Sequence, residues 1–354
     1  MEKNFLITTG GSGGHVLPAV ILYEHLSKQA NMIISTDKRG LKYLDQNIYN
    51  FEIINTPKLN NIFLLPLNII LVFILTLKSI FLLKRKKIQK IFSTGGYMSL
   101  PVILAGRFLN SDIYLLEPNQ IIGRSNKYFL KYCIRIFCYT DTIKNFPEKY
   151  KNKIVVINPL VREHVYKKKS PSRIGDKLNL LIVGGSQGAN IFDKNIKNSI
   201  VNISKKIQIK ILQQTKENNI VSLTNFYSKN NLENEIFSFD KNFTNKLSQI
   251  NICITRAGAS TLAELSVMNI PFIAVPLPSS KDNHQLENAN FYKNNGCCWV
   301  IEQKNFEEKI EDLLNNIIKN ENKYLEKKKN LKKMNCQNTW NSANQKILRV
   351  INEN

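Results

Sequence analysis

The chain has 354 residues, a length that suits two domains, each with its own hydrophobic core. Hydrophobic residues make up 43% and charged residues 22%, which is typical of folded proteins and excludes a disordered chain. The net charge of +23 favours nucleic acid, anionic lipid or phosphorylated substrates as partners, with a solvated lysine-rich surface as the alternative. Zinc-finger spacing, aromatic RNA-binding motifs and basic zippers are missing, so we expect no nucleic-acid partner.

Cysteine and histidine placement indicates neither a disulfide framework nor a metal site. The six cysteines form no C-x-x-C pair, and the four histidines do not stand beside them at ligand spacing. We therefore expect buried free thiols in a reducing compartment. The sequence begins directly with an apolar segment, without a basic region or cleavage site, which argues against a signal peptide.

The first half of the chain alternates apolar and helical segments. Residues 4–9 predict a buried strand that ends at a glycine loop, residues 10–14. Residues 15–26 then predict a helix with Pro18 in its first turn, where proline is tolerated. Further strands are predicted at residues 32–35, 91–93, 113–116, 136–139 and 154–157. This alternation indicates a parallel sheet covered by helices on both faces.

Residues 62–83 form a strongly apolar stretch, and the basic cluster at 84–87 follows it. A membrane span needs about 20 apolar residues in a row, and Pro66, Asn68 and Lys78 interrupt this stretch. Because it is apolar on nearly all faces, we expect a helix that packs inward on one side and dips into lipid on the other. A plain core helix and a true span are the alternatives. The expected membrane-contacting residues are Ile69, Phe73, Leu77, Phe81, Lys84 and Arg85.

The second half repeats the pattern of the first. A strand at residues 178–183 leads into a second glycine loop at 184–188, and a helix follows. Strands are predicted at residues 207–212, 235–239, 251–255, 272–275 and 298–301. The basic segment 167–177, with Pro, Gly and Ser, is the expected linker. We therefore predict an α/β chain of two doubly wound parallel-sheet domains, with ligands at the carboxyl ends of the strands, in the cleft between the domains.

Glycine loops after a strand bring backbone N–H groups and a helix N-terminus to an anion. The first loop departs from the dinucleotide spacing G-x-G-x-x-G, because Val16 occupies the third glycine position. Nicotinamide or flavin binding is therefore disfavoured, although Asp37 is placed where a ribose-binding carboxylate would be. A third anion site is expected where a helix begins near Ser260, with Glu264 one turn later reaching ribose hydroxyls. A capping role for Ser260, with Glu264 facing solvent, is the alternative.

Seven motifs occur in the order found in one enzyme family. They are GGSGGH (10–15), GGYMSLP (95–101), EPN (117–119), NPLVR (158–162), GGSQGA (184–189), RAGASTLAE (256–264) and DNHQLENA (282–289). Together they resemble the MurG family of glycosyltransferase family 28, the undecaprenyl-diphospho-muramoylpentapeptide β-N-acetylglucosaminyltransferases of peptidoglycan synthesis. The resemblance spans nearly the whole chain and implies the GT-B fold, two Rossmann-like domains facing a cleft. The implied domains are 1–161, joined by the last helix at 338–354, and 162–337.

The resemblance implies an inverting transfer of GlcNAc from UDP-GlcNAc to the C4 hydroxyl of MurNAc in the acceptor lipid I, giving lipid II. UDP-GlcNAc is then a substrate, and no cofactor or metal is expected, since the sequence has no Asp-x-Asp motif. The family's membrane patch falls near residues 62–83. The implied location is peripheral, on an anionic surface at the cytoplasmic face of the inner membrane, with cell-wall synthesis and division proteins as candidate partners.

The resemblance also implies roles for individual residues. On the donor side, Glu264 would bind the ribose, His284 and Gln285 the GlcNAc hydroxyls, and a residue near Phe239 the uracil. The diphosphate contacts would be Arg162, Ser186, Ala259, Ser260 and Thr261. On the acceptor side, Ser12, Gly13 and Gly14 would lie near the pyrophosphates, and Tyr97 and Asn119 near the reacting sugars. Although they belong to the acceptor side, Ser12, Gly13, Gly14 and Asn119 are also predicted to contribute to donor binding. Tyr97 is predicted to be a catalytic residue.

His15, at the end of the first strand, is the expected general base, because a histidine near pKa 6.5 accepts a proton at neutral pH. The alternative is that His15 only caps its helix or orients phosphate, and Glu117 is the competing base. Helix N-termini and Arg162 would stabilise the charge on the departing diphosphate.

Four residues depart from the family pattern. They are Leu100 for a glycine, Leu116 for a common histidine, Pro118 for a glutamine, and His284 for a glutamine. Tyr97, Asn119, Glu264 and Gln285 are retained, so we expect an active enzyme. The alternatives are another GT-B glycolipid glycosyltransferase and a nucleotide-sugar-binding protein without turnover.

Overall fold

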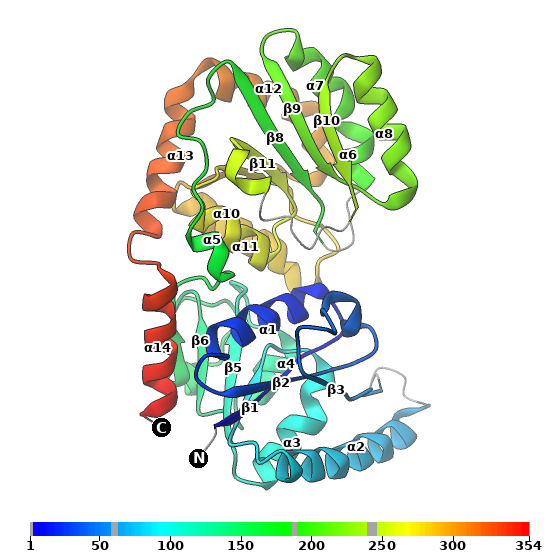
Figure 1. Ribbon diagram of the computed structural model, residues 1–354, viewed down its shortest axis with the longest axis vertical. Helices are drawn as coiled ribbons and strands as arrows, with labels where there is room; N and C mark the ends of the chain where they lie inside the picture. Colours follow the sequence, from blue (N-terminus) through cyan, green and yellow to red (C-terminus); the bar gives the residue numbers. More distant parts are fainter. Residues whose placement is uncertain (1–2, 58–62, 186–189, 239–245, 354) are drawn as a thin grey trace. The chain divides into compact units, whose positions relative to one another are not determined.

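The computed structural model describes residues 3–57, 63–185, 190–238 and 246–353, and it divides the chain into two compact units. Unit 1 comprises Met1–Glu163 and Thr339–Asn354, and unit 2 comprises His164–Asn338. The motifs had placed these boundaries at 161/162 and 337/338. The C-terminal helix α14, Trp340–Asn352, therefore belongs to unit 1 and contacts helix α1 (Figure 1).

Unit 1 is built on a seven-stranded parallel sheet in the order β3-β2-β1-β4-β5-β6-β7. The strands are β1 Asn4–Thr8, β2 Asn31–Thr36, β3 Phe51–Ile53, β4 Lys90–Ser93, β5 Asp112–Glu117, β6 Arg135–Cys138 and β7 Ile154–Val156. The longer helices are α1 Gly13–Leu26, α2 Leu65–Arg85, α3 Leu100–Phe108 and α4 Arg124–Phe129. Short 3-10 turns lie at Gly40–Tyr43, Tyr97–Ser99 and Glu148–Lys153.

Helices cover both faces of this sheet. On one face, Phe5 and Ile7 of β1 pack with Leu22 of α1 and Ile347 of α14. On the other face, side chains of α2, α3 and α4 pack against Leu6 of β1 and against β4 and β5. The strands are buried on both sides and therefore read as continuous apolar runs in the sequence.

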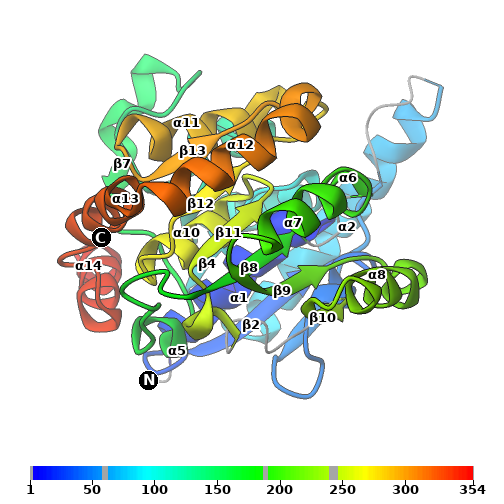
Figure 2. The ribbon, with the colours of Figure 1, turned by 90° about the horizontal axis from the view of Figure 1, so that it is seen from above.

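Unit 2 has a six-stranded parallel sheet in the order β10-β9-β8-β11-β12-β13 (Figure 2). The strands are β8 Lys177–Val183, β9 Gln208–Gln214, β10 Glu233–Phe237, β11 Ile252–Thr255, β12 Phe272–Ala274 and β13 Cys298–Val300. The helices are α5 Glu163–Tyr166, α6 Asn190–Asn195, α7 Lys197–Ser204, α8 Glu217–Lys229, α10 Ala259–Val267, α11 His284–Asn294, α12 Phe306–Lys319 and α13 Glu321–Met334. Short 3-10 turns lie at Leu247–Gln249, Lys281–Asn283 and Gln303–Asn305.

The predicted α/β class is confirmed, and each of the twelve predicted strands overlaps an observed one. Strand β3 was not predicted, because its three residues are half-buried or exposed at the sheet edge and form no apolar run. Helix α1 begins at Gly13, so Pro18 lies well inside it and not in its first turn. Five cysteines are buried, as expected, but Cys336 is exposed.

Candidate active site

Each sheet reverses its strand order at one point, and in open α/β sheets ligands bind at that point, beyond the carboxyl ends of the strands. In unit 1 the reversal lies between β1 and β4, where Thr8 pairs with Ser93. In unit 2 it lies between β8 and β11, where Val183 pairs with Thr255. The GGSGGH and GGYMSLP motifs follow β1 and β4, and the GGSQGA and RAGASTLAE motifs follow β8 and β11. The described residues of these four motifs therefore sit at the two switch points.

His15 lies in the first turn of α1, half-buried against the loop after β4. Its ring Nδ1 is 3.0 Å from the Thr94 carbonyl oxygen. Gly95 and Gly96 have φ values of +89° and +85°, which favour glycine. A Cβ on Gly95 would lie 3.3 Å from the imidazole, and one on Gly96 would lie 3.2 Å from the Gly10 carbonyl oxygen. The two glycines thus let this loop close onto His15.

This contact fixes the tautomer of the neutral imidazole. A carbonyl oxygen only accepts hydrogen bonds, so Nδ1 of His15 carries the proton and donates it to Thr94. Nε2 then holds the lone pair of the neutral ring and is the nitrogen that can accept a proton. Thr94 also donates its hydroxyl to the His15 carbonyl oxygen at 2.9 Å, so the residue is held at both backbone and side chain. This arrangement suits the role of base expected for His15.

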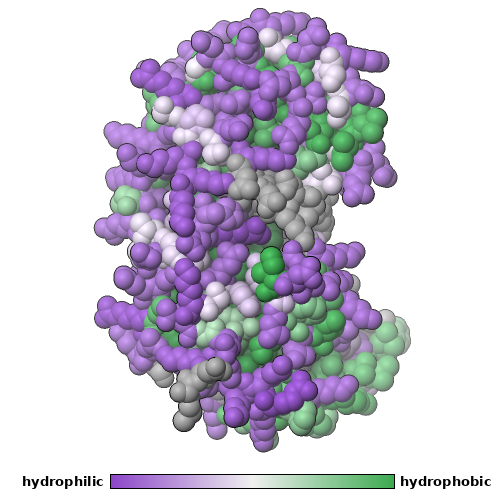
Figure 3. All heavy atoms as spheres, viewed as in Figure 1, coloured by the Kyte–Doolittle hydropathy of each residue, from purple (hydrophilic) through white to green (hydrophobic). Residues whose placement is uncertain are grey.

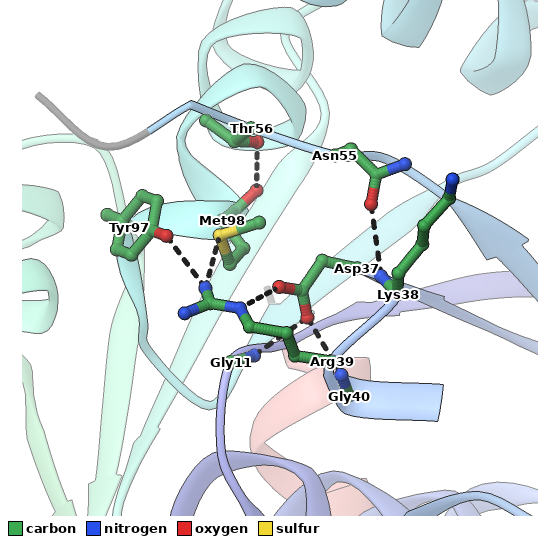
Figure 4. A network of polar contacts seen from close by, with 9 residues as sticks. All are labelled: Gly11, Asp37, Lys38, Arg39, Gly40, Asn55, Thr56, Tyr97 and Met98. Atoms are coloured by element: carbon green, nitrogen blue, oxygen red, sulfur yellow. Dashed lines mark hydrogen bonds and ion pairs between the residues drawn. The ribbon is translucent and has the colours of Figure 1, made fainter. Parts of the chain in front are cut away.

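The glycine loop after β1 is held by a buried carboxylate, Asp37 (Figure 4). Its Oδ1 accepts from the backbone N–H groups of Gly11 and Gly40, each at 2.9 Å. Its Oδ2 accepts from Arg39 Nε at 2.8 Å, and Arg39 Nη2 donates to the Tyr97 hydroxyl at 2.7 Å. One network therefore links the loop after β1, the segment after β2 and the loop after β4.

The network also decides the charge of Asp37. Burial tends to raise its pKa, but the hydrogen bonds from Arg39, Gly11 and Gly40 outweigh burial and hold the pKa below its usual value. Both carboxylate oxygens of Asp37 accept hydrogen bonds from the protein. Asp37 therefore stabilises the glycine loop and is not arranged to bind a ribose. Arg39 was missed in the sequence because only the fold brings it to Tyr97.

Glu117 ends β5 and is 2% exposed. Oε1 accepts from the Asn119 backbone N–H at 3.2 Å and from Asn119 Nδ2 at 2.8 Å. Oε2 accepts from the Gly123 N–H at 2.8 Å and from Asn126 Nδ2 at 3.0 Å. Both oxygens are engaged by the following loop, so the geometry favours a role in positioning Asn119 over that of a base.

The departures on the acceptor side fit this framework. Leu116 is buried in β5, and its carbonyl oxygen accepts from Asn126 Nδ2 at 3.1 Å. Leu100 begins α3 and packs half-buried against the core, and Pro118 lies between the two members of the Glu117–Asn119 pair. With these three side chains in place, Glu117 still accepts hydrogen bonds from Asn119, Gly123 and Asn126.

In unit 2, helix α10 begins at Ala259, with Gly258 in the N-cap position. Ala259, Ser260 and Thr261 therefore form its first turn, whose N–H groups point toward the switch point. The capping alternative for Ser260 is wrong, because Gly258 holds that position. Glu264 lies half-buried one turn later.

The arginine of the same motif has a structural role. Arg256 Nη1 donates to the carbonyl oxygens of Val275, at 2.9 Å, and Pro276, at 3.3 Å, and Nη2 donates to Gln303 Oε1 at 2.6 Å. Burial lowers its pKa. The guanidinium thus ties the loops after β11, β12 and β13 together.

Helix α11 is held near α10 by amide side chains. Asn288, buried, donates to the Ala257 carbonyl oxygen at 3.0 Å, and Gln285 Oε1 accepts from the Leu277 N–H at 3.0 Å. His284 Nδ1 lies 2.8 Å from the Lys281 carbonyl oxygen at the start of the helix. The Leu277 contact thus orients the Gln285 amide, and Asn288 is a positioning residue that the motif alone did not single out.

The remaining diphosphate residue, Arg162, belongs to unit 1 and not to the predicted donor domain. It lies near Glu24 of α1: burial raises the pKa of Glu24, and the positive charge of Arg162 opposes that rise. Two other predicted donor residues, Ser186 and Phe239, lie outside the described residues.

Helix α2 exposes most of its apolar surface (Figure 3). Phe73 is 62% exposed and Phe81 67%, and Ile69, Leu77, Lys84 and Arg85 are exposed as well. Only its inner side, with Val72, Leu82 and Leu83, is buried. The alternative of a plain core helix is therefore wrong. By length and composition α2 is apolar enough to cross a membrane, with mean hydropathy 2.2.

The basic cluster after α2 is partly neutralised. The Arg85 guanidinium lies 3.6 Å and the Lys86 ammonium 3.8 Å from the Glu52 carboxylate. Arg85 also lies over the Phe81 ring at 5.9 Å. The basic and aromatic side chains thus meet at the C-terminal end of the apolar face.

Comparisons with known proteins agree with this architecture. Residues 5–138 match the glycosyltransferase family 28 N-terminal domain, and residues 179–341 match the glycosyltransferase family 28 C-terminal domain. The UDP-N-acetylglucosamine–N-acetylmuramyl-(pentapeptide) pyrophosphoryl-undecaprenol N-acetylglucosamine transferase of Pelagibacter ubique is 49% identical over 358 residues, covering 100% of both chains. The transferase of the same name from Rickettsia felis is 35% identical over 332 residues, covering 89% of this chain and 91% of its own.

A solved structure shows the same fold. The crystal structure of Acinetobacter baumannii MurG matches with a TM-score of 0.76 at 20% identity, covering 100% of both chains. The two domain matches, the identity to full-length relatives and the two switch points lead to one family. The chain belongs to glycosyltransferase family 28 and, within it, to the MurG family of UDP-GlcNAc-dependent N-acetylglucosamine transferases.

Proposed function

We propose that this chain transfers GlcNAc from UDP-GlcNAc to the C4 hydroxyl of MurNAc in lipid I, with inversion, releasing UDP and lipid II. Membership of the family supports the reaction, and the His15 contact to Thr94 is the observation in the structure that carries the mechanism. It leaves the histidine able to act as a base at a switch point lined by glycine loops. UDP-GlcNAc is a substrate, and the chemistry needs no redox or group-carrying cofactor.

Unit 2 supplies the donor site. The first turn of α10, from Ala259 to Thr261, faces the diphosphate with its N–H groups, and negative charge that builds up there is stabilised by the helix N-terminus. Glu264 binds the ribose hydroxyls one turn later. Gln285, held by the Leu277 N–H, offers its amide donors to the sugar.

Unit 1 supplies the acceptor site and the base. The C4 hydroxyl gives its proton to Nε2 of His15 while its oxygen forms the bond to C1 of GlcNAc. The bond between C1 and the diphosphate oxygen breaks on the opposite face, and UDP leaves with the electron pair. Asn119, oriented by Glu117, and Tyr97, bound to Arg39, position the acceptor sugar.

The acceptor is membrane-anchored in this proposal, and α2 docks the enzyme on the bilayer. Its exposed phenylalanines and isoleucines enter the headgroup boundary, and Lys84 and Arg85 contact anionic lipid. Peripheral binding fits a helix whose inner side is packed into unit 1. The cytoplasmic face is the side that the family resemblance implies.

The proposal is tested by the release of UDP from UDP-GlcNAc in the presence of a soluble lipid I analogue. We expect UDP-GlcNAc to be turned over in preference to UDP-GalNAc and UDP-glucose, with GlcNAc appearing on the analogue. Binding of UDP-GlcNAc without release of UDP would indicate a binding protein without turnover. Equal use of another acceptor glycolipid would indicate a different glycosyltransferase.

A further inference from the structure

A pocket of about 490 Å³ lies in unit 2, at the edge strand β13. Its floor is formed by Trp299 and Val300 of β13 and by Leu313 of α12. Cys298 and Ile301 complete the apolar lining. Figure 2 shows β13 between α11 and α12. The pocket contains none of the residues assigned above to donor or acceptor binding.

Three lysines from three helices surround this floor. Lys293 comes from α11, Lys309 from α12 and Lys327 from α13, and the described lining includes no carboxylate. The Lys327 ammonium lies 5.7 Å from the centre of the Trp299 ring. An apolar floor with a basic rim is complementary to a ligand that carries an apolar side chain flanked by acids.

The backbone of β13, beside the pocket, can also orient a bound peptide. In the described sheet β13 pairs only with β12. The Ile301 N–H donates to the Ala274 carbonyl oxygen of β12 at 3.0 Å. Because successive residues of a strand direct their N–H groups to opposite sides, the Val300 N–H points away from β12, to the open edge. An extended peptide can pair there as an added strand.

We propose that β13 and this pocket form a docking surface for an extended acidic segment of another protein. One apolar side chain of the segment enters the pocket against Trp299 and Leu313. Its carboxylates meet Lys293, Lys309 and Lys327, and its backbone pairs with Val300. None of these residues is assigned a role in the transfer reaction, so a partner bound here would leave the residues proposed to bind the substrates uncovered.

The chain offers a direct reporter of this pocket. It contains only two tryptophans, Trp299 and Trp340, and Trp340 stacks on His25 in unit 1. In the full-length Trp340→Phe protein, the fluorescence comes from Trp299 alone. The probe is an acetylated and amidated heptapeptide of alternating Glu and Ile or Val, titrated into this protein. The same peptide with Lys in place of Glu is the charge control.

We expect the acidic peptide to shift the Trp299 emission in a saturable way and the basic peptide to leave it unchanged. The double variant Lys309→Glu/Lys327→Glu should weaken binding about tenfold or more. Lys323→Glu/Lys329→Glu is the matched control on α13, because both lysines are exposed and outside the lining; it should change affinity less than about threefold. Binding that survives the first pair, or falls equally in both, overturns the proposal.

Strand addition is tested separately. Val300→Pro removes the outward N–H while keeping the bonds to β12, since proline is tolerated on an edge strand. It should weaken the peptide about three- to tenfold. Hydrogen exchange of the Val300 amide in the protein without this substitution should slow when the peptide saturates it. Unchanged exchange, or an equal Trp299 response to inorganic phosphate alone, would show an anion pocket and overturn the peptide assignment.

Discussion

The two units share the order of their first six strands but place different groups at the point where that order reverses. In unit 1 the loops after β1 and β4 adjoin His15, whose Nδ1 lies 3.0 Å from the Thr94 carbonyl oxygen, so the neutral ring carries its lone pair on Nε2. In unit 2 the corresponding helix start after β11 offers backbone N–H groups, and the arginine of the motif, Arg256, hydrogen-bonds to the loops after β12 and β13. We propose that the same scaffold serves proton transfer in one copy and anion binding in the other.

Both units also use buried charges to hold their loops. Asp37 and Glu117 in unit 1 accept hydrogen bonds from loop N–H groups, as Arg256 in unit 2 donates to loop carbonyls. The comparison teaches that a charged residue in a family motif is not by itself a catalytic group. It predicts that changes in unit 1 act mainly on turnover and changes in unit 2 on donor affinity.

The largest expected effect is that of His15→Ala. Loss of the base should lower kcat by about two to four decades, while the affinity for UDP, bound in unit 2, changes little. Steady-state kinetics with a soluble acceptor and calorimetry with UDP measure the two quantities. Near-normal turnover would rule out His15 as the base.

The next largest effect concerns membrane binding, which we propose for helix α2 of unit 1. Phe73→Asp/Phe81→Asp should reduce partition onto anionic vesicles about 100-fold, because two exposed aromatic side chains no longer enter the lipid. Turnover of a soluble acceptor should persist. Val221→Asp, at a residue of α8 in unit 2 that is 69% exposed, is the matched control and should bind vesicles normally. Equal loss in the control would contradict the assignment.

Glu264→Ala tests the role proposed for unit 2 in donor binding. Removing the carboxylate that accepts hydrogen bonds from the ribose hydroxyls should raise KM for UDP-GlcNAc about 10- to 100-fold, with a smaller change in kcat. Glu264→Gln should recover part of the affinity, since the amide oxygen still accepts a hydrogen bond from one ribose hydroxyl. A fall in kcat with unchanged KM would place Glu264 with the chemistry instead.

The smallest effect is expected for Asp37→Asn. An amide cannot accept from Gly11, Gly40 and Arg39 together, so the loop loosens and kcat should fall about three- to tenfold. The folded pKa of Asp37 lies below its unfolded value. The stabilisation it gives is therefore complete above the unfolded pKa and is lost as the pH falls through the folded pKa. Thermal melting from pH 6 to pH 3 should show a weaker pH dependence in the variant.

The sequence predicted the sheets well because their strands are buried on both faces and read as short apolar runs, such as 178–183. It missed β3, whose residues lie half-exposed at an edge. It predicted the apolar outer face of α2 because a helix apolar all round exceeds what one core contact needs.

The site was harder to predict than the sheets. The motifs indicated which loops carry function, but the links of Arg39 to Tyr97 and of Glu117 to Asn119 depend on which loops meet at the switch point. The same applies to Arg162, which adjoins the domain boundary in the sequence and lies near Glu24 in unit 1. Spacing within a motif does not encode these tertiary contacts.

The division of labour between the units is tested most directly by a crystal structure with UDP-GlcNAc bound. The account predicts the ribose hydroxyls within hydrogen-bonding distance of the Glu264 carboxylate, the diphosphate at the first turn of α10, and the GlcNAc near Gln285. A uridine bound instead at the glycine loop of unit 1, beside His15 and Asp37, would contradict it.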